Sequence, residues 1–400
     1  MIAVLLAASE DIRMRPLTYT RPKAMLPLAN KPILEHLIMQ ARDAGITEYL
    51  IVVGFNGETI RQYFGNGEKW GISIEYISQR QQLGTADAVL RTRERIGNRF
   101  LVINGDIVAR AKDIKQLAGS NNIAVLLTEV DNAADLGVVE EDKGVIRHIQ
   151  EKKSDTSSRI VSTGVYLFTD AIFSAIESIP VSPRGAYDLT DALQQLIDSG
   201  SQVESRNTDY WFNPDYPWDL LKANSLFMSD FEIKSSARIE DNVSIRGNVS
   251  IGEETYIESG VRIEGPVVIG NRCRIGSCSQ IRSGTSIGDN CQISSFVRIE
   301  NSIILNNSRI SSHVYVSDSI IGETCFLGPG TKIAPMRFDA GNVRVANINT
   351  GLQRLGAIFG DNVHTGLNVC VDAGTLIGNG TILGPGAISK GVLLPNSRIL

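Results

Sequence analysis

Two different rhythms of apolar and polar residues divide the chain. In the first half, continuous apolar runs have the length of strands that are buried on both faces, and they cover residues 2–8, 49–55 and 100–104. Between the first two runs, apolar residues from Ile33 to Ala41 recur at helical spacing. This alternation predicts a Rossmann-like α/β domain with a parallel sheet over residues 1–230, in which ligands bind at the carboxyl ends of the strands.

In the second half, isoleucine occupies every sixth position from 239 to 299. A small or β-branched residue stands four positions after each of the first isoleucines, as at Val243, Val249 and Thr255. A repeat this short cannot bury its own apolar face, so successive copies must stack on one another. The period therefore predicts an all-β domain over residues 235–400, a parallel β-helix built from hexapeptide repeats.

The repeat is interrupted near its end. Its phase slips by one residue at Ile304 and again at Ile321, and residues 334–357 break it before it resumes at Phe359. An insertion in a solenoid is expected to protrude, and protruding loops often carry function. Residues 217–231 are predicted to form a helix that links the two domains.

Length and composition agree with two soluble domains. A chain of 400 residues exceeds what one hydrophobic core usually serves, and 42% apolar with 21% charged residues is typical of a globular protein. The net charge of −5 and a pI near 5.6 give no broad attraction for nucleic acid or anionic lipid. The first apolar run is too short to span a membrane and lacks the features of a signal peptide, so a cytoplasmic location is expected.

Five cysteines lie in the second half, without a C-x-x-C pair or a histidine cluster beside them. Three of them, Cys273, Cys291 and Cys325, occupy the small-residue slot of the hexapeptide repeat. We interpret all five, including Cys278 and Cys370, as thiols packed in the core. Neither disulfides nor a thiolate metal site is expected.

The first strand runs into a distinctive segment, residues 6–18, which reads LAASEDIRMRPLT, and RPKAMLP follows at residues 21–27. This resembles the opening motif of sugar-1-phosphate nucleotidylyltransferases, L-A-A-G-x-G-x-R-x-x-P-L-T followed by P-K. The resemblance implies that Arg13 and Lys23 are catalytic cations that hold a triphosphate, and that Ala8 and Ser9 lie against the nucleotide. Ser9 and Asp11 replace glycines of the motif, so either the loop is repacked around Asp11 or activity is reduced.

A second segment, residues 79–88, reads QRQQLGTADA and resembles the family's base-binding segment. The resemblance implies that Gln79 and Gly84 bind the base of the nucleotide and that Thr85 also belongs to the nucleotide-binding residues. A glutamine amide both donates and accepts hydrogen bonds, which suits the imide edge of uracil or thymine, so UTP or dTTP is the expected substrate. Taken alone, the same residues read as a helix start with Thr85 as its cap.

Two further positions are predicted to hold Mg²⁺. Asp106 follows the apolar run at residues 100–104, which places a carboxylate at the carboxyl end of a buried strand. The resemblance implies a second ligand from the segment YWFN, that is Asn213, with Asp219 as a nearby competitor. An ordinary turn is the alternative interpretation of Asp106, because N-G-D is also common in turns.

The sugar 1-phosphate is assigned to four residues by the same resemblance. Glu151 and Lys152 match an E-K pair, Ser162 begins a segment similar to N-T-G-x-Y, and Gly137 matches a glycine that faces the sugar. Glu151 and Lys152 equally suit exposed charges at a strand end. The transfer itself needs no general base, because a sugar phosphate is already an anionic nucleophile, so His36 and His148 are interpreted as surface or packing residues.

The whole chain resembles the archaeal and bacterial bifunctional enzymes that make UDP-N-acetylglucosamine, whose left-handed β-helix forms trimers and acetylates glucosamine 1-phosphate from acetyl-CoA. In that region Tyr315 matches a family tyrosine, but Ser312 stands where a catalytic base is expected and His313 follows it. Pro335 replaces a loop asparagine. We therefore favour a β-helix that serves for trimer formation or regulation, with acetyl transfer at His313 and Tyr315 as the alternative. A nucleotide-sugar sensor without activity is a third hypothesis.

Overall fold

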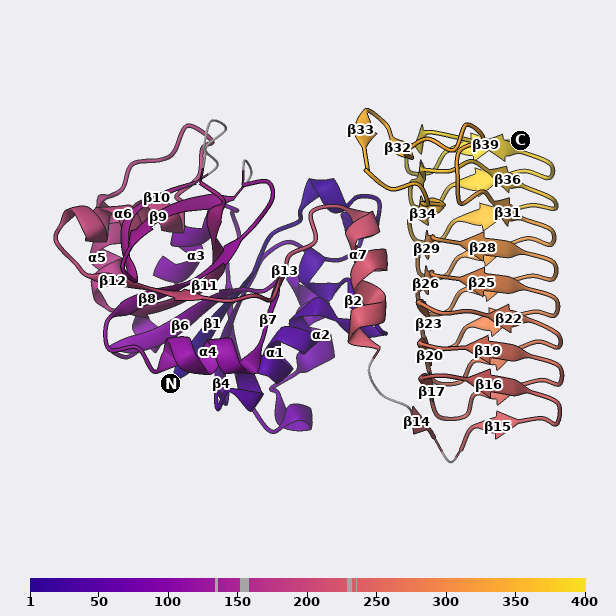
Figure 1. The fold of residues 1–400 in the computed structure, drawn as a ribbon, viewed down its shortest axis with the longest axis horizontal. Helices are drawn as coiled ribbons and strands as arrows, with labels where there is room; N and C mark the ends of the chain where they lie inside the picture. The colour runs from indigo at the N-terminus through magenta and orange to yellow at the C-terminus, as the bar shows by residue number, and fades with distance from the viewer. Residues whose placement is uncertain (134–135, 152–157, 229–231, 235) are drawn as a thin grey trace. The chain divides into compact units, whose positions relative to one another are not determined.

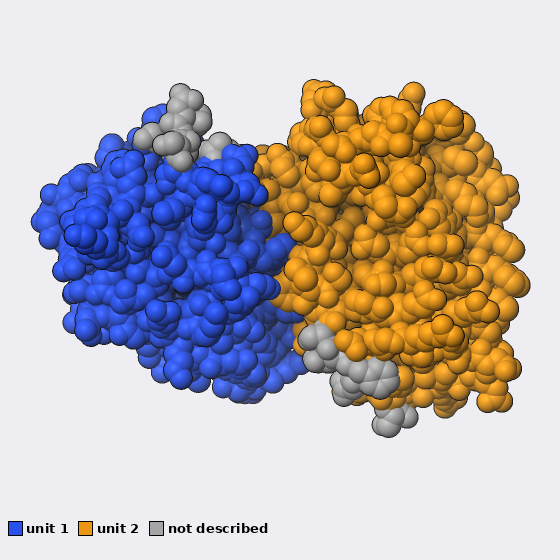
Figure 2. All heavy atoms as spheres, in the orientation of Figure 1, with its two compact units in different colours: residues 1–10, 21–25, 32–213 blue, residues 11–20, 26–31, 214–400 orange. Residues whose placement is uncertain are grey.

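The structure, a computed structural model, describes residues 1–133, 136–151, 158–228, 232–234 and 236–400. The chain divides into two compact units (Figure 2). Unit 1 comprises residues 1–10, 21–25 and 32–213, and unit 2 comprises residues 11–20, 26–31 and 214–400.

Unit 1 is built on a nine-stranded sheet with the order β5-β4-β1-β6-β11-β8-β12-β10-β9 (Figure 1). Its strands are β1 (Ile2–Ala7), β4 (Glu48–Val53), β5 (Ser73–Ser78), β6 (Arg99–Asn104), β8 (Ile123–Glu129), β9 (Gly137–Asp142), β10 (Val145–Glu151), β11 (Ile160–Thr169) and β12 (Val203–Asn207). The predicted parallel pairing holds for β5, β4, β1 and β6. The rest of the sheet is mixed, because β11 runs antiparallel to β6 and β8, and β9 and β10 form a hairpin.

Helices cover both faces of this sheet. They are α1 (Ile33–Asp43), α2 (Gly57–Phe64), α3 (Thr85–Leu90), α4 (Ala111–Ala118), α5 (Ala171–Ser178) and α6 (Leu189–Asp198). Side chains alternate between the two faces along a strand, so Leu5 packs in one buried cluster with residues of α1, α2 and α4, and Val4 packs in another with residues of α3, α5 and α6. The runs at 2–8, 49–55 and 100–104 thus become the central strands, buried on both sides.

The second unit contains three all-parallel sheets of nine, nine and eight strands, as in a left-handed β-helix. The first sheet contains β14 (Glu232–Ile233), β17 (Val249–Ile251), β20 (Val267–Ile269), β23 (Thr285–Ile287), β26 (Ile303–Ile304), β29 (Ile320–Ile321), β34 (Ala357–Phe359), β37 (Thr375–Ile377) and β40 (Val392–Leu393). The second contains β15 (Arg238–Ile239), β18 (Tyr256–Ile257), β21 (Arg274–Ile275), β24 (Gln292–Ile293), β27 (Arg309–Ile310), β30 (Phe326–Leu327), β35 (His364–Thr365), β38 (Ile382–Leu383) and β41 (Arg398–Ile399). The third contains β16 (Ser244–Arg246), β19 (Arg262–Glu264), β22 (Gln280–Ile281), β25 (Arg298–Glu300), β28 (Tyr315–Ser317), β31 (Lys332–Ile333), β36 (Cys370–Val371) and β39 (Ile388–Ser389).

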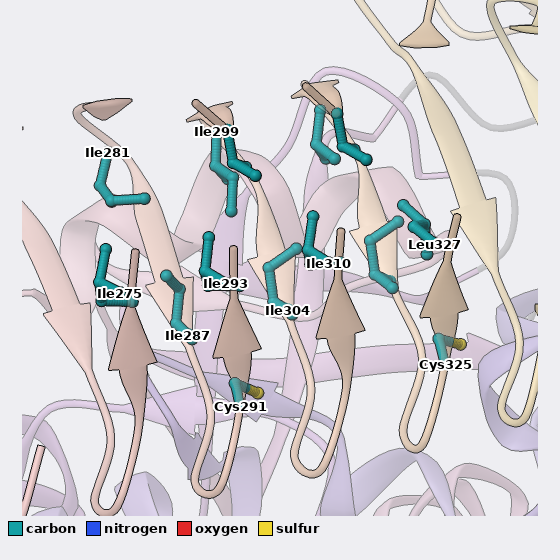
Figure 3. Packing of buried hydrophobic residues seen from close by; sticks show 14 of the residues in the cluster. Ile275, Ile281, Ile287, Cys291, Ile293, Ile299, Ile304, Ile310, Cys325 and Leu327 are labelled. Carbon is teal, nitrogen blue, oxygen red and sulfur yellow. The ribbon is translucent and has the colours of Figure 1, made fainter. Parts of the chain in front are cut away.

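Stacked aliphatic side chains fill the interior of the β-helix (Figure 3). In the second sheet, for example, Ile275 pairs with Ile293, and Ile293 pairs with Ile310 on the next coil. All three side chains are at most 2% exposed. The period of six in the sequence therefore arises because, in each coil, every one of the three faces turns the side chain at its isoleucine position inward.

The interpretation of the cysteines is right for three and wrong for two. Cys273, Cys291 and Cys325 are buried in the interior, but Cys278 and Cys370 are exposed. Cys278 stands in a turn with φ of +60°, and Cys370 precedes the buried Val371 in β36 and so faces outward. Of the five cysteines, only the three in the small-residue slot of the repeat therefore face inward.

Shorter elements lie outside these sheets. The predicted linker helix ends earlier than residue 231: α7 spans Pro217–Asn224, and a 3₁₀ turn follows at Ser225–Phe227. The Asn224 side chain bonds to the backbone of Ala29 and Gly284, outside the helix. The insertion at 334–357 contains an antiparallel hairpin of β32 (Arg344–Val345) and β33 (Ile348–Asn349), which projects from the β-helix in Figure 1.

Candidate active site

A cavity of about 350 Å³ lies at the carboxyl ends of β1 and β6. This edge of an α/β sheet is where ligands are expected. The cavity is lined by Leu6, Ala7, Ala8, Ser9, Lys23, Ala24, Gln79, Gln82, Gly84, Thr85, Ala88, Asn104, Asp106 and Ala186. It thus brings together every predicted nucleotide-binding residue with Lys23 and Asp106, and we call it the nucleotide cavity.

Lys23 forms the centre of the polar contacts at this edge. Its Nζ lies 3.0 Å from Asp106 Oδ2 and donates a hydrogen bond of 3.0 Å to Asn213 Oδ1. Lys23 is only 3% exposed. A buried ammonium held by a carboxylate and an amide oxygen is a strongly localised positive charge.

A short strand pairing explains why Asn213 and Asp106 lie together although they are distant in the sequence. Strand β7 (Val108–Ala109) runs antiparallel to β13 (Trp211–Phe212). The residues that precede β7 and follow β13 therefore meet at one end of this two-stranded ribbon. The sequence predicts that both residues follow strands, but it contains no recognisable signal for the pairing of β7 with β13.

The predicted base-binding segment is held in a fixed shape. Gln79 is 4% exposed, and its Nε2 donates to Gly84 O at 3.0 Å and to Asp87 Oδ2 at 2.7 Å. Gly84 has φ of +105°, and a Cβ at this position would lie 2.3 Å from Tyr187 O. Only glycine fits this backbone, which approaches the backbone of Tyr187 closely.

Thr85 does not cap its own helix α3. Its Oγ1 instead accepts a hydrogen bond of 3.0 Å from Leu189 N, in the first turn of α6. Gln82, for which the sequence predicts no role, donates from Nε2 to Ala8 O at 3.0 Å. The Gln82 side chain thus connects the base-binding segment to the loop after β1. The family motif assigns no role to this residue.

A smaller cavity of about 90 Å³ contains the predicted sugar-binding residues. Its lining includes Gly137, Glu151, Ser162 and Asn213, and we call it the sugar cavity. Lys152 lies outside the described residues. A Cβ on Gly137 would lie 3.2 Å from Glu151 Oε2, a tight contact that would shift the carboxylate by a few tenths of an ångström.

Asn104 lines both cavities. Its side chain lies directly against Gly164, where a Cβ would come within 2.4 Å of Asn104 Nδ2. Since Lys23 and Asp106 line the nucleotide cavity and Asn213 lines the sugar cavity, the contacts of Lys23 also join the two. The two cavities therefore share one polar boundary, formed by Asn104 and the Lys23 contacts.

Hydrogen bonds connect residues that line the sugar cavity. Ser162 Oγ donates to Tyr166 Oη at 2.9 Å, and Gly164 N donates to Ser162 Oγ at 3.3 Å. Burial raises the pKa of Tyr166, so this phenol stays protonated and uncharged at neutral pH. Trp211 Nε1 donates to Thr163 O at 2.9 Å and closes the same wall.

Arg13 lies in residues 11–20, the part of the loop after β1 that belongs to unit 2. Its Nη2 is 2.9 Å from Asp215 Oδ1, and its side chain is 39% exposed. Asp11 adopts φ of +54°, a left-handed conformation that aspartate tolerates better than most residues, and its Oδ1 accepts from Arg13 N at 3.2 Å. The loop thus keeps a backbone conformation that glycine favours, with the Asp11 carboxylate bonded to the backbone of Arg13.

Neither residue of the predicted acetyl-transfer pair extends into the β-helix interior. His313 is exposed, has φ of +62°, and stacks on Phe296 with ring centroids 5.2 Å apart. Tyr315 donates from its hydroxyl to Glu300 Oε1 at 3.1 Å. Asp219, the competitor of Asn213, instead accepts hydrogen bonds from the backbone of Asp215 and Tyr216 and so caps α7.

The donor set at the boundary of the cavities suits a hard cation. Mg²⁺ takes one or two protein oxygens and completes its shell with phosphate oxygens and water. Asp106 and Asn213 present a carboxylate and an amide oxygen to the same ammonium group. Within the described residues there is no cluster of three or more His, Cys, Asp or Glu side chains that could hold a metal by themselves.

Comparison with known proteins decides the family. The family model described as nucleotidyl transferase matches residues 2–226, more than half of the chain. A relative from Methanococcus maripaludis strain C7, named bifunctional protein GlmU, is 44% identical over 100% of this chain and 97% of its own length. The chain belongs to the nucleotidyl transferase family. It is therefore an enzyme, and its second half, residues 263–382, matches the model of the GMPPB C-terminal domain.

Other relatives of this nucleotidyl transferase have related names. A protein of Sulfurisphaera tokodaii named bifunctional sugar-1-phosphate nucleotidylyltransferase/acetyltransferase is 33% identical over 97% of both chains. A crystal structure of a putative glucose-1-phosphate thymidylyltransferase from Bacillus anthracis, in complex with a sucrose, matches with a TM-score of 0.52 and 25% identity. That match covers 56% of this chain and 95% of the other. Among the described residues, no helix of this nucleotidyl transferase is both long and apolar enough to cross a membrane.

Proposed function

We propose that this nucleotidyl transferase joins UTP or dTTP to a sugar 1-phosphate and releases pyrophosphate, in a reaction that requires Mg²⁺. The observation that carries the proposal is the polar boundary between the two cavities, where Lys23 contacts Asp106 and Asn213. A reaction between two bound phosphates needs cations at the point where the phosphates meet. Lys23 and Asp106 line the cavity of about 350 Å³, and Asn213 lines the smaller one.

In the proposed reaction, an oxygen of the sugar 1-phosphate attacks the α-phosphorus of the nucleotide. A new P–O bond forms, and the bond between the α-phosphorus and the oxygen that leads to the β-phosphorus breaks, so that pyrophosphate leaves. The nucleophile is already anionic near neutral pH, because the second pKa of a phosphate monoester is about 6. No side chain has to remove a proton, and the residues of the site act by positioning and by neutralising charge.

The two cations have different tasks in this reaction. Lys23 is buried at the boundary and is suited to the phosphates that react, while Arg13 holds the departing pyrophosphate through its guanidinium fork. Asp106 and Asn213 would hold Mg²⁺, which supplies charge neutralisation on the phosphate oxygens. Lys23 then moves its hydrogen bonds from these two side chains to the phosphates.

The base and the sugar are assigned to opposite ends of the site. Both N–H groups of the Gln79 amide are engaged by Gly84 and Asp87, so Gln79 would contribute its carbonyl oxygen as an acceptor for the imide N–H of uracil or thymine. Gly137, Glu151, Lys152 and Ser162 would bind the sugar 1-phosphate. A carboxylate such as Glu151 is a suitable acceptor for sugar hydroxyls.

Pyrophosphate release across a panel of four nucleoside triphosphates and several sugar 1-phosphates tests the proposal. We expect release that depends on Mg²⁺, on a sugar 1-phosphate and on UTP or dTTP. Release from no combination would contradict nucleotidyl transfer and would favour the nucleotide-sugar sensor. Release with ATP or GTP alone would leave the reaction but overturn the assignment of the base.

The β-helix is proposed to act as a scaffold that forms a homotrimer in the cytoplasm, where nucleoside triphosphates and sugar phosphates are made. Large apolar side chains on its surface, among them Phe296, Leu367 and Ile388, are more than half exposed and offer contact area for other copies. Light scattering tests the trimer by the molar mass, for which we expect three times 43.5 kDa. A mass of one chain would contradict it.

Acetyl transfer is a second candidate because relatives of this chain are named bifunctional. It would use acetyl-CoA and place His313 and Tyr315 at the reacting amine. The stacking of His313 on Phe296 and the bond from Tyr315 to Glu300 favour the scaffold role instead. An assay for thiol release from acetyl-CoA with glucosamine 1-phosphate separates the two, and release that His313→Ala abolishes would establish the second activity.

A further inference from the structure

The segment that carries Arg13 groups with the β-helix and not with the α/β sheet. Arg13 lies in residues 11–20, which group with the β-helix, whereas Lys23 lies in residues 21–25, which group with the α/β sheet. Residues 26–31 belong to the β-helix unit again. In Figure 2 residues 11–20 and 26–31 carry the orange of unit 2, and residues 21–25 carry the blue of unit 1. Residues 1–31 are therefore divided between the two units.

A specific hydrogen bond ties the Arg13 segment to the β-helix. Thr20 Oγ1 donates to Asp361 Oδ2 at 2.5 Å. The other oxygen of this carboxylate, Oδ1, accepts from Glu323 N at 2.7 Å on the preceding coil. Because Asp361 is anchored by the backbone of the β-helix, it holds the end of the Arg13 segment at a defined point.

The next segment has its own attachment, centred on Asn224. This amide is fully buried, accepts from Ala29 N at 2.8 Å through Oδ1, and donates to Gly284 O at 3.0 Å through Nδ2. Asn30 Nδ2 donates to Ile287 O at 2.6 Å in β23. Ala29 and Asn30 both have positive φ, of +47° and +67°, so these bonds hold a backbone turn that an alanine would not adopt by itself.

Hydrogen bonds inside the first segment connect its fixed end to Arg13. Thr18 Oγ1 donates to Asp11 O at 3.0 Å, and Asp11 Oδ1 accepts from Arg13 N. Met14, Leu17 and Thr18 are at most 2% exposed, so the segment is packed rather than free. A displacement at Thr20 would therefore be transmitted to the backbone that carries Arg13.

We propose that the β-helix is a positioning element for nucleotidyl transfer, and that Asp361 is a positioning residue that acts on Arg13 through Thr20. The inference rests on the proposed function, since it assigns a role in that reaction to a residue in the β-helix. An error in the placement of a catalytic group by about 1 Å costs on the order of 10²-fold in rate. A contact that only restrains a loop should cost less, and we expect about tenfold in kcat.

The chain offers a closely matched control. Asp361 and Asp289 both stand in a G-D-N turn, at residues 360–362 and 288–290. Asp289 Oδ1 accepts from Asn271 N at 2.8 Å, the same type of bond between coils that Asp361 makes to Glu323 N. The bond from Thr20 is made to Asp361. Comparison of Asp361→Ala with Asp289→Ala thus separates the loss of that contact from a general weakening of the β-helix.

The experiment measures pyrophosphate release and the melting temperature for the full-length wild type and the variants Asp361→Ala, Asp289→Ala, Thr20→Val and Thr20→Ser. We expect Asp361→Ala and Thr20→Val each to lower kcat about tenfold with little change in KM for the sugar 1-phosphate, because Arg13 acts on the departing pyrophosphate. Combination of the two should cause no further loss, since they remove one shared contact. Thr20→Ser keeps the hydroxyl and should keep the wild-type kcat.

Each other outcome overturns a defined statement. Equal values of kcat for Asp361→Ala and Asp289→Ala, with an active wild type, would show that Asp361 has no role in positioning and would leave the proposed function intact. A loss of kcat in Thr20→Ser equal to that in Thr20→Val would exclude the hydrogen bond as the cause. An inactive wild type would contradict the proposed function itself.

Discussion

Lys23 Nζ lies 3.0 Å from Asp106 Oδ2, on the boundary between the nucleotide cavity and the sugar cavity. The ammonium is almost completely buried and also donates to Asn213. Buried charges are held only where partners compensate them. This contact therefore places one ammonium, one carboxylate and one amide oxygen at the boundary of the two cavities.

Replacement of Lys23 by methionine keeps the length of the side chain and removes its charge. We expect kcat/KM for pyrophosphate release to fall on the order of 10²-fold or more, since an electrostatic group at a reacting centre typically contributes this much. Lys115→Met, on the exposed face of α4, is the control. If both variants retain wild-type rates, Lys23 has no part in the reaction.

Asp106→Asn tests the proposed metal ligand. The substitution keeps the size of the side chain but removes the charge that a hard cation prefers, so the Mg²⁺ concentration for half-maximal activity should rise about tenfold or more. The variant Asp198→Asn, at the exposed end of α6, should leave the Mg²⁺ titration unchanged. Identical Mg²⁺ titrations for Asp106→Asn and wild type would exclude Asp106 as a ligand.

Gly84→Ala should damage the nucleotide cavity in particular. The new Cβ would lie 2.3 Å from Tyr187 O, on a backbone with φ of +105° and ψ of 176°, a region that only glycine occupies readily. We expect a loss of stability of about 1–3 kcal/mol and an increased KM for the nucleotide. Gly45→Ala shares the positive φ of +96° but meets no atom within 4 Å, and its KM for the nucleotide should match that of the wild type.

Accessible thiols provide a test of the β-helix that is independent of activity. The native protein should react rapidly with a thiol reagent at Cys278 and Cys370, and the other three cysteines should react only after unfolding. The neighbouring Cys273 thiol and burial both raise the pKa of Cys291, which further lowers its reactivity. Rapid modification of five thiols in the native state would contradict the packing of the interior.

The repeat revealed the second domain because each of its inward positions follows from a local pattern. An isoleucine in every sixth position can face inward only if the coils stack, and Ile275, Ile293 and Ile310 do so. The cysteines show the limit of the same argument. Cys278 and Cys370 are the same residue type as the three buried cysteines, but they do not occupy the position of the repeat that faces the interior.

Only part of the candidate site could be predicted from the sequence. The resemblance to a family singled out residues that line two cavities, and the assigned roles of these residues remain predictions. The contacts of Lys23 with Asp106 and Asn213 depend on the pairing of β7 with β13, which are too short to predict from local pattern. The predicted domain ranges, 1–230 and 235–400, also remain a prediction, and the grouping of residues 11–20 with the β-helix follows from long-range contacts that no local signal announces.

The most direct test of the central claim follows both phosphorus-containing products in one reaction by ³¹P NMR, with UTP or dTTP, a sugar 1-phosphate and Mg²⁺. The account predicts pyrophosphate and a nucleoside diphosphate sugar in equal amounts, formed by the wild type and not by Lys23→Met. Hydrolysis of the triphosphate without a nucleotide sugar, or equal product from Lys23→Met, would contradict it.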